Sequence, residues 1–359
     1  MKDIGSIFPL YDSDMKPVSV ETGFAVNQEK MYYSLCREAL YAIAESLDGK
    51  NKQVLLPAYT CDTVITPFKE LGWECHYFSL GKNLRMNRES VKEIFRQYQC
   101  SLIVVHPYYG MELNEEEADL LKELHALGSK IVVDVTQGIY TMQELDFVDY
   151  YVGSYRKWFK VPDGAFLKSS QGLENIQHPL EENEDFVSTQ KRAMYLRGSY
   201  FVSQNQQEKD VSIKLNKEAE RMVDHKITPH KMSTFSYSIL KNNNEFIESQ
   251  KQRIENYRFL HENISKIREV GLVCEDMGEV KTAPLYFTIY VQDRRALQST
   301  LAEAHIYAPV IWPVVYDEVL IDNNVDYIYK SLLAIPIDQR NSQEEMVRII
   351  ETITNHYHD

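Results

Sequence analysis

The segment from Ile131 to Phe166 contains an acid, an amide and a lysine whose spacing suits catalysis. Asp134 directly follows the β-branched run 131–133, and Lys157 comes soon after a second strand-like run at Tyr150–Ser154. Short β-branched runs are typical of buried strands, and open α/β sheets bind ligands at the carboxyl ends of their strands. We therefore expect the carboxylate and the amine to lie at one edge of a sheet.

This arrangement suits pyridoxal phosphate. Its aldehyde needs a lysine amine, for which Lys157 is the candidate, and its pyridine nitrogen needs a carboxylate, for which Asp134 is the candidate. Gln137 lies three residues after Asp134, Ser154 lies three before Lys157, and a Pro-Asp-Gly turn follows at 162–164. An isolated Asp after a strand is usually a turn former and an isolated Lys usually covers apolar surface, so the prediction depends on the whole constellation.

Lys160 is a second candidate for the amine. It lies three residues after Lys157 in the same aromatic segment, and periodicity alone does not separate the two. The spacing to Ser154 and Gly164 favours Lys157. Arg156 is excluded because a guanidinium stays protonated and is a poor nucleophile.

Length and charge indicate a large soluble enzyme. The chain has 359 residues, 44% of them hydrophobic, which exceeds one ordinary domain and is enough for a substantial core. A formal charge of −14 without clustered Lys and Arg argues against a nucleic-acid partner. The sequence shows neither a membrane-spanning apolar run nor a secretory signal, so we expect a cytoplasmic protein with no membrane partner.

The cysteines predict neither a disulfide framework nor a metal site. They are odd in number and irregularly spaced, which favours the reduced state: Cys36, Cys61, Cys75, Cys100 and Cys274. A zinc site built from Cys61, Cys75 and Cys100 with His76 and His106 would lack the paired short spacings of zinc ligands. We expect no metal, and Cys75, His76 and Cys100 fit strand or strand-edge positions.

Strand-like runs alternate with helical patterns through the first half of the chain. Strands are expected at Val54–Pro57, Cys75–Leu80, Leu102–His106, Ile131–Asp134 and Tyr150–Ser154. Helices are expected at Ser34–Leu47, Cys61–Leu71, Val91–Tyr98 and Glu115–Leu127. This βαβ series predicts an α/β fold with a mostly parallel sheet and the site along its carboxyl edge.

The second half predicts a smaller α+β domain. A polar helical pattern covers Gln171 to Arg221, and a long helical stretch covers Lys231 to Val270. Further strands are expected at Pro284–Val291 and Ile306–Ile311, with helices near Arg294–Ala304 and Gln343–Asn355. The predicted domains are 1–245, which binds the cofactor, and 246–359.

These residues resemble the DegT-type family of pyridoxal phosphate-dependent aminotransferases, which transfer an amino group to keto sugars attached to nucleotides. The resemblance covers nearly the whole chain, in segments at Ile4–Phe8, Ser34–Leu40, Leu55–Val64, Val104–Gly110, Val132–Gly138, Ser154–Gly164, Tyr307–Pro313 and Leu332–Ile337. It implies an aspartate-aminotransferase-like fold, with a large cofactor-binding domain followed by a small C-terminal domain.

The resemblance also implies roles for individual residues. Lys157 would form the imine with the cofactor, Asp134 would pair with the pyridine nitrogen, Gln137 would hydrogen-bond the ring hydroxyl, and Ser154 would bind phosphate. The backbone amides of Arg37 and Glu38 would also bind phosphate, since a helix N-terminus does so through free N–H groups and its dipole.

Three positions depart from the family pattern. Cys36 replaces a glycine at the helix start. Cys61 stands where many members carry an aromatic residue that stacks on the cofactor ring, so its thiol or one of the tyrosines at 59, 108 and 109 would pack there. Segment 228–233 lacks the family's Asn that reaches the partner subunit's cofactor, and Lys231 or His230 would take its place.

The predicted function is transfer of an amino group from a donor such as glutamate to a keto sugar, by a homodimer. The helices around 191–241 carry more aromatic residues than a surface helix needs, and two-fold association would cover them. Lys191, Arg192 and Arg197 are candidates for binding a substrate carboxylate, unless they are simply solvated. Dehydrating relatives have His in place of the lysine and fit less well, whereas a regulatory or scaffolding cofactor-binding protein without turnover stays an alternative.

Overall fold

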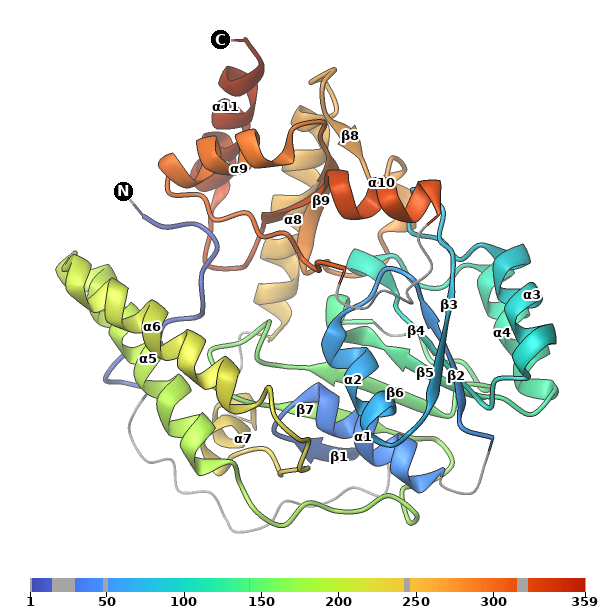
Figure 1. Cartoon of the computed structure of the whole chain (residues 1–359). Coiled ribbons are helices and arrows are strands. Elements are labelled where there is room, and N and C mark those ends of the chain that lie inside the picture. Colours follow the sequence, from blue (N-terminus) through green and yellow to red (C-terminus); the bar gives the residue numbers. More distant parts are fainter. Residues whose placement is uncertain are drawn as a thin grey trace.

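Two β-sheets organise the chain in this computed structural model, which describes residues 2–14, 30–47, 51–141, 143–241, 246–314 and 322–358. The larger sheet has seven strands and the smaller sheet has three. Figure 1 shows the smaller sheet and its helices packed above the larger sheet.

The larger sheet is mostly parallel. Its order is β1-β7-β6-β5-β4-β2-β3. The strands are β1 (Lys30–Tyr33), β2 (Gln53–Pro57), β3 (Glu74–Phe78), β4 (Leu102–Val105), β5 (Lys130–Asp134), β6 (Tyr150–Ser154) and β7 (Ala165–Lys168). Strands β2 to β6 are parallel, and β7 runs antiparallel to both β6 and β1. The predicted α/β class, the parallel sheet and the strands β2 to β6 are confirmed.

Helices connect these strands as the sequence predicts. They are α1 (Cys36–Ser46), α2 (Asp62–Glu70), α3 (Arg88–Tyr98) and α4 (Glu115–Ala126). Local chemistry sets their starts, because the side chains of Asn87 and Asn114 accept hydrogen bonds from first-turn amides of α3 and α4. The parallel strands are buried on both faces, as in β4, where all four residues are buried.

The middle of the chain forms a helical hairpin, α5 (Glu184–Ser203) and α6 (Gln206–Met222), which projects to one side in Figure 1. The helical pattern expected from Gln171 therefore begins only at Glu184. Helices α7 (Thr234–Lys241) and α8 (Phe246–Ile264) follow. The expected helix over 231–270 is wrong at both ends, because 231–233 and 265–270 are not helical.

The smaller sheet is antiparallel, in the order β10-β9-β8. Its strands are β8 (Gly271–Leu272), β9 (Tyr286–Tyr290) and β10 (Leu332–Pro336), and its helices are α9 (Arg294–Glu303), α10 (Asn323–Ser331) and α11 (Gln343–His358). The strand expected at Ile306–Ile311 is wrong: only Ile306 forms a bridge, to Ile4, and Pro309 cannot donate to a ladder.

Each sheet has its own hydrophobic core. The core of the smaller sheet includes Ile4, so the start of the chain packs there. The predicted domain boundary at residue 245 falls in 242–245, outside the described residues, and stays a prediction. None of the helices that the structure describes is long and apolar enough to cross a membrane.

Candidate active site

A cavity of about 250 Å³ lies at the carboxyl ends of β4, β5 and β6, beside the N-terminus of α1. We call it the strand-end cavity. Among its lining side chains are six of the predicted site residues: Arg37, Cys61, Asp134, Gln137, Ser154 and Lys157. Residues far apart in the sequence therefore meet where the parallel sheet was expected to place them.

Asp134 is a buried carboxylate at the end of β5. It is 6% exposed and accepts a hydrogen bond from the Thr136 amide at 2.9 Å. His106 Nδ1 lies 3.6 Å from Asp134 Oδ2, and His106 Nε2 lies 2.7 Å from the Thr60 hydroxyl. Burial lowers the pKa of His106, so the imidazole is neutral near pH 7. Within the described ranges, no lysine or arginine pairs with Asp134, and its charge is left for a ligand.

Lys157 and Lys160, which the sequence did not separate, have different surroundings. Lys157 lines the strand-end cavity, and its charge lowers the pKa of His106. Lys160 Nζ instead forms an ion pair with Asp14 Oδ1 at 2.7 Å and does not line this cavity. The adjacent Trp158 donates from Nε1 to the Thr136 carbonyl at 2.8 Å, which ties the lysine loop to the end of β5. The geometry thus favours Lys157.

The start of α1 forms one wall of the strand-end cavity. Cys36 and Arg37 line it, and the first amides of a helix have no partner within the helix. The Arg37 side chain donates to the Val223 carbonyl at 2.7 Å. Glu38 does not line the cavity: its amide donates to the Leu35 carbonyl at 3.1 Å, and its carboxylate accepts from the His230 amide at 3.1 Å. An anion-binding role for the Glu38 amide stays a prediction.

Gln137 and Ser154 complete the polar lining. Gln137 is 4% exposed, and its Oε1 has no hydrogen-bond donor in the part of the chain described. The Ser154 amide donates to the Thr136 hydroxyl at 3.2 Å, so β6 is linked to the turn after β5. A buried amide oxygen without a donor is costly. Gln137 Oε1 is therefore available to a ligand hydroxyl.

Trp312 gives the strand-end cavity an aromatic surface, which Cys61, at the position where the family carries an aromatic residue, does not provide. Cys61 lines the strand-end cavity at the start of α2, and Trp312 lines it from the segment after α9. The tyrosines 59, 108 and 109 are buried outside the lining, and Tyr59 packs on Trp312 with ring centroids 4.9 Å apart. Sequence reasoning noted the segment 307–313 but could not assign its neighbours, because about 250 residues separate it from α2.

Lys231 and His230 lie outside the strand-end cavity. His230 Nδ1 is 3.5 Å from Glu38 Oε1, and Lys231 Nζ is 4.0 Å from Glu182 Oε1. The structure contains one chain, so a role for either residue at a partner subunit's cofactor stays a prediction.

The cysteines are free, and His76 stacks on Tyr98 with ring centroids 3.7 Å apart. Across the described ranges, no three His, Cys, Asp or Glu side chains gather in a way that could hold a metal ion.

A larger cavity, of about 390 Å³, shares Arg156, Lys157 and Glu220 with the first one. We call it the two-sheet cavity, because residues flanking both sheets line it together with α5, α6 and the N-terminal segment 5–8. Lys157 therefore borders both spaces. This is the position required of a group that acts between a bound cofactor and a substrate.

Comparison with protein-family models finds no match, and comparison with curated proteins finds no similar sequence. Solved structures do match. PseC of Helicobacter pylori, an aminotransferase involved in the biosynthesis of pseudoaminic acid, superposes with a TM-score of 0.68 at 9% identity, over 99% of this chain and 100% of that one.

Two further structures superpose over most of the chain. NtdA of Bacillus subtilis, solved with bound cofactor PMP, gives a TM-score of 0.65 at 14% identity, over 92% of this chain and 73% of that one. The sugar aminotransferase CalS13 of Micromonospora echinospora gives 0.63 at 14% identity, over 91% and 87%. At such identities the likeness establishes the fold, and the expectation from sequence is confirmed: this chain has the fold of pyridoxal phosphate-dependent aminotransferases.

Proposed function

We propose that the protein is a pyridoxal phosphate-dependent aminotransferase. The observation that carries the proposal is the pairing, in one cavity, of Lys157 with a buried carboxylate, Asp134, that has no cationic partner among the described residues. The protonated pyridine nitrogen of the cofactor would form an ion pair with the Asp134 carboxylate, and the cofactor aldehyde would form an imine with the Lys157 amine.

The other residues of the strand-end cavity fit the same cofactor. Gln137 Oε1, which lacks a donor in the described chain, suits the ring hydroxyl. The N-terminus of α1 and the Ser154 hydroxyl suit the phosphate, because free amides and the helix dipole attract anions. The Trp312 ring and the Cys61 thiol suit the faces of the pyridine ring.

Bound pyridoxal phosphate supplies the electron sink that stabilises negative charge at the reacting carbon. Asp134 would keep the pyridine nitrogen protonated, and neutral His106, held by Thr60, lies beside the Asp134 carboxylate without neutralising it. Lys157 would hold the cofactor through its amine. When free, the amine at Nζ would act as a general base that moves a proton at the reacting carbon.

The substrate would occupy the two-sheet cavity. Its volume of about 390 Å³ lies within the range of small-molecule sites. Solved relatives include proteins described as sugar aminotransferases. These observations support a keto sugar as acceptor; we further propose that the sugar is nucleotide-linked and that glutamate is the donor. A cytoplasmic location stays a prediction.

We also propose a homodimer with the hairpin α5–α6 near the interface. Apolar side chains are exposed along it, at Tyr195, Val202, Ile213 and Met222, whose exposed fractions range from 36% to 79%. Two-fold association is the commonest way to cover such a surface. In a dimer, the segment 228–233 could reach the neighbouring site, as the sequence predicts for Lys231.

The test is the donor half-reaction. The protein is loaded with pyridoxal phosphate, and the absorbance of the bound cofactor is followed while L-glutamate is added. We expect conversion to the pyridoxamine form, and we expect Lys157→Ala to abolish it. Lys160→Ala is the matched control and should retain conversion, since Lys160 pairs with Asp14. A regulatory protein without turnover would bind the cofactor but show no conversion with any donor.

Borohydride reduction identifies the lysine independently of turnover. We expect it to attach the cofactor to the peptide that contains Lys157. Attachment to Lys160 alone would contradict the assignment. Active protein is then incubated with a panel of nucleotide-linked keto sugars to identify the acceptor.

A further inference from the structure

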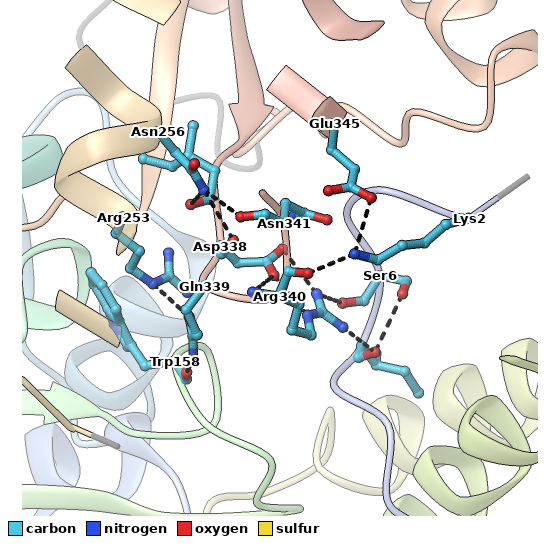
Figure 2. Close-up of polar contacts among 12 residues, drawn as sticks. Lys2, Ser6, Trp158, Arg253, Asn256, Asp338, Gln339, Arg340, Asn341 and Glu345 are labelled. Atoms are coloured by element: carbon cyan, nitrogen blue, oxygen red, sulfur yellow. Dashed lines mark hydrogen bonds and ion pairs between the residues drawn. The ribbon is translucent and has the colours of Figure 1, made fainter. Parts of the chain in front are cut away.

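A buried arginine without a carboxylate partner lies in the two-sheet cavity. Arg253, on α8, is 1% exposed and lines this cavity together with Lys157. Its Nε donates to Gln339 Oε1 at 2.8 Å and its Nη1 donates to the Leu285 carbonyl at 3.1 Å. Both acceptors are neutral, and Nη2 has no acceptor in the described part of the chain. Figure 2 shows the guanidinium between Gln339 and the Trp158 ring.

The other two arginines around the two-sheet cavity are paired with carboxylates. Arg156 forms an ion pair with Glu220 at 2.8 Å. Arg340 binds both oxygens of Asp338, from Nε at 2.7 Å and from Nη2 at 3.0 Å (Figure 2). Of the guanidinium groups that line this cavity, Arg253 alone has no carboxylate within ion-pair distance among the described residues.

The Arg253 guanidinium keeps its charge. Burial lowers its pKa, but the negative charge of Asp338, which Arg340 already binds, opposes this, and the pKa stays at about 10, so Arg253 is protonated at neutral pH. Buried charges in proteins are normally paired, because an unpaired ion in a water-poor site is costly. An anion in the cavity would remove this cost, and a planar guanidinium with a free nitrogen suits a carboxylate.

Arg253 is also tied to the loop that carries the lysine. The guanidinium carbon lies 4.5 Å from the centroid of the Trp158 ring, and Gln339 Nε2 donates to the Trp158 carbonyl at 2.8 Å. Trp158 is the next residue after Lys157. Arg253 and Lys157 also line the same cavity, so an anion bound to Arg253 there would share that space with the amine, as required of a carboxylate attached to the reacting carbon.

A second polar group in the two-sheet cavity lacks a partner. Gln190 is 6% exposed, and its Nε2 donates to Asn216 Oδ1 at 2.9 Å. Its Oε1 has no donor within the described residues. This oxygen suits an N–H or O–H of the same ligand, so the cavity offers both a cation and an acceptor.

The arginines and lysine that the sequence suggested for this task are not at the site. Arg197 is buried and pairs with Asp3 at 3.4 Å, so the expectation that it is solvated is wrong. Lys191 lies over the Phe235 ring at 3.9 Å. Neither they nor Arg192 line either cavity.

We propose that Arg253 binds the carboxylate of the amino donor, an α-amino acid, in the two-sheet cavity; this rests on the proposed aminotransferase function. The guanidinium orients the donor amine towards Lys157. A keto sugar without a carboxylate would use the neutral acceptors and donors of the same cavity instead.

The first experiment compares two amines in the half-reaction. Wild-type protein and Arg253→Gln, both loaded with pyridoxal phosphate, are treated with L-glutamate or with propylamine, which has no carboxylate. We expect the ratio of the glutamate rate to the propylamine rate to fall about 30-fold or more in Arg253→Gln, the usual effect of removing one partner of a buried charge pair. Arg258→Gln, an exposed arginine on the same helix, is the matched control and should leave the ratio unchanged.

The outcomes separate binding from support of the fold. Equal slowing with both amines would mean that Arg253 only braces Trp158, and it would overturn the proposal. So would a change confined to the acceptor half-reaction, which would assign the anion to a nucleotide diphosphate. If Arg253→Gln does not fold, Arg253→Lys is used instead. It keeps the positive charge but lacks the planar guanidinium that can bind both carboxylate oxygens, and it should show a smaller fall in the ratio of the glutamate rate to the propylamine rate.

A binding measurement decides the matter without turnover. Glutarate has carboxylates but no amine, and its binding to the cofactor-loaded protein is measured by calorimetry. Binding to wild type that is lost in Arg253→Gln supports the site, even if no donor reacts and the proposed function fails. Equal binding to both proteins, or none to wild type, overturns it.

Discussion

Asp163 allows a quantitative prediction about what holds the lysine loop in place. It lies in the Pro-Asp-Gly turn after Lys157 and is fully buried, at 0% exposure. Its carboxylate accepts from the Ser233 amide at 2.8 Å, from the Ser233 hydroxyl at 2.6 Å and from the Ser236 hydroxyl. The turn is therefore fixed to the start of α7, and its acid is more than a turn former.

The magnitude follows from these three hydrogen bonds. A hydrogen bond to a charged group contributes about 1.5–3 kcal/mol, and removing one member of a buried charged network costs about 3–5 kcal/mol. Asp163→Ala leaves all three donors without this acceptor, so we expect a loss of about 4 kcal/mol. Asp163→Asn keeps one oxygen but turns an amide donor towards a hydroxyl or N–H donor, so we expect about 2 kcal/mol.

Urea unfolding followed by circular dichroism measures the loss. Asp276→Asn is the matched control, because Asp276 also caps a turn, accepting from the Gly278 amide at 2.7 Å, but is exposed. It should cost less than about 1 kcal/mol. If Asp163→Asn unfolds at the same urea concentration as wild type, the Asp163 network contributes nothing and the reasoning is refuted.

Three further predictions follow, two on the strand-end cavity and one on the pair His230–Glu38 outside it. Asp134→Asn should retain cofactor but lose the glutamate-dependent absorbance change by several orders of magnitude, and near-normal conversion would contradict the pyridine pairing. Glu38 raises the pKa of His230, so this pair stabilises the fold fully below the unfolded value of about 6.5 and loses its effect as pH rises through the folded value. Stability measured from pH 6 to 8 should fall, and His230→Gln should flatten the fall. Trp312→Leu should weaken retention of cofactor on dialysis about 2- to 10-fold, the range expected for one aromatic contact, whereas Trp73→Phe, remote from the cavity, should not.

The parts of the fold that the sequence predicted are those with a strong local pattern. Strands β2 to β6 are apolar, β-branched runs separated by amphipathic helices. This alternating pattern is compatible with few folds other than a parallel α/β sheet. Strands β1 and β7 have four residues each and mix Lys with aromatics, so nothing local distinguishes them from loops. Strand β10 directly follows α10, and its run of Leu, Ala and Ile fits a helix equally well.

The candidate site divides in the same way. Asp134, Gln137, Ser154 and Lys157 occur within one short segment, and their spacing made them visible as a set. His106 and Trp312 come from other strands and loops, and only the folded chain brings them together. Sequence shows which element a residue occupies, but the residues it meets depend on tertiary packing.

Arg253 was missed for a related reason. It lies in the mixed polar sequence QKQRIENYRF, which is typical of a solvated helix, and nothing local marks one arginine as buried. Its burial results from the packing of α8 against the smaller sheet, with Leu285 and Gln339 supplied from elsewhere in the chain. A polar residue that is buried in this way can be identified only after its neighbours in the folded chain are known.

The two buried charges have complementary requirements. Asp134 is an anion in the strand-end cavity and Arg253 is a cation in the two-sheet cavity, and neither has an ion-pair partner of opposite permanent charge among the described residues. Lys157 borders both spaces. Burying each unpaired charge destabilises the folded chain. A ligand that pairs with either charge binds only the folded chain and must therefore stabilise it. A cationic ring nitrogen would satisfy the first and a carboxylate would satisfy the second, so the proposed function puts the cofactor on one side of the lysine and the amino acid on the other.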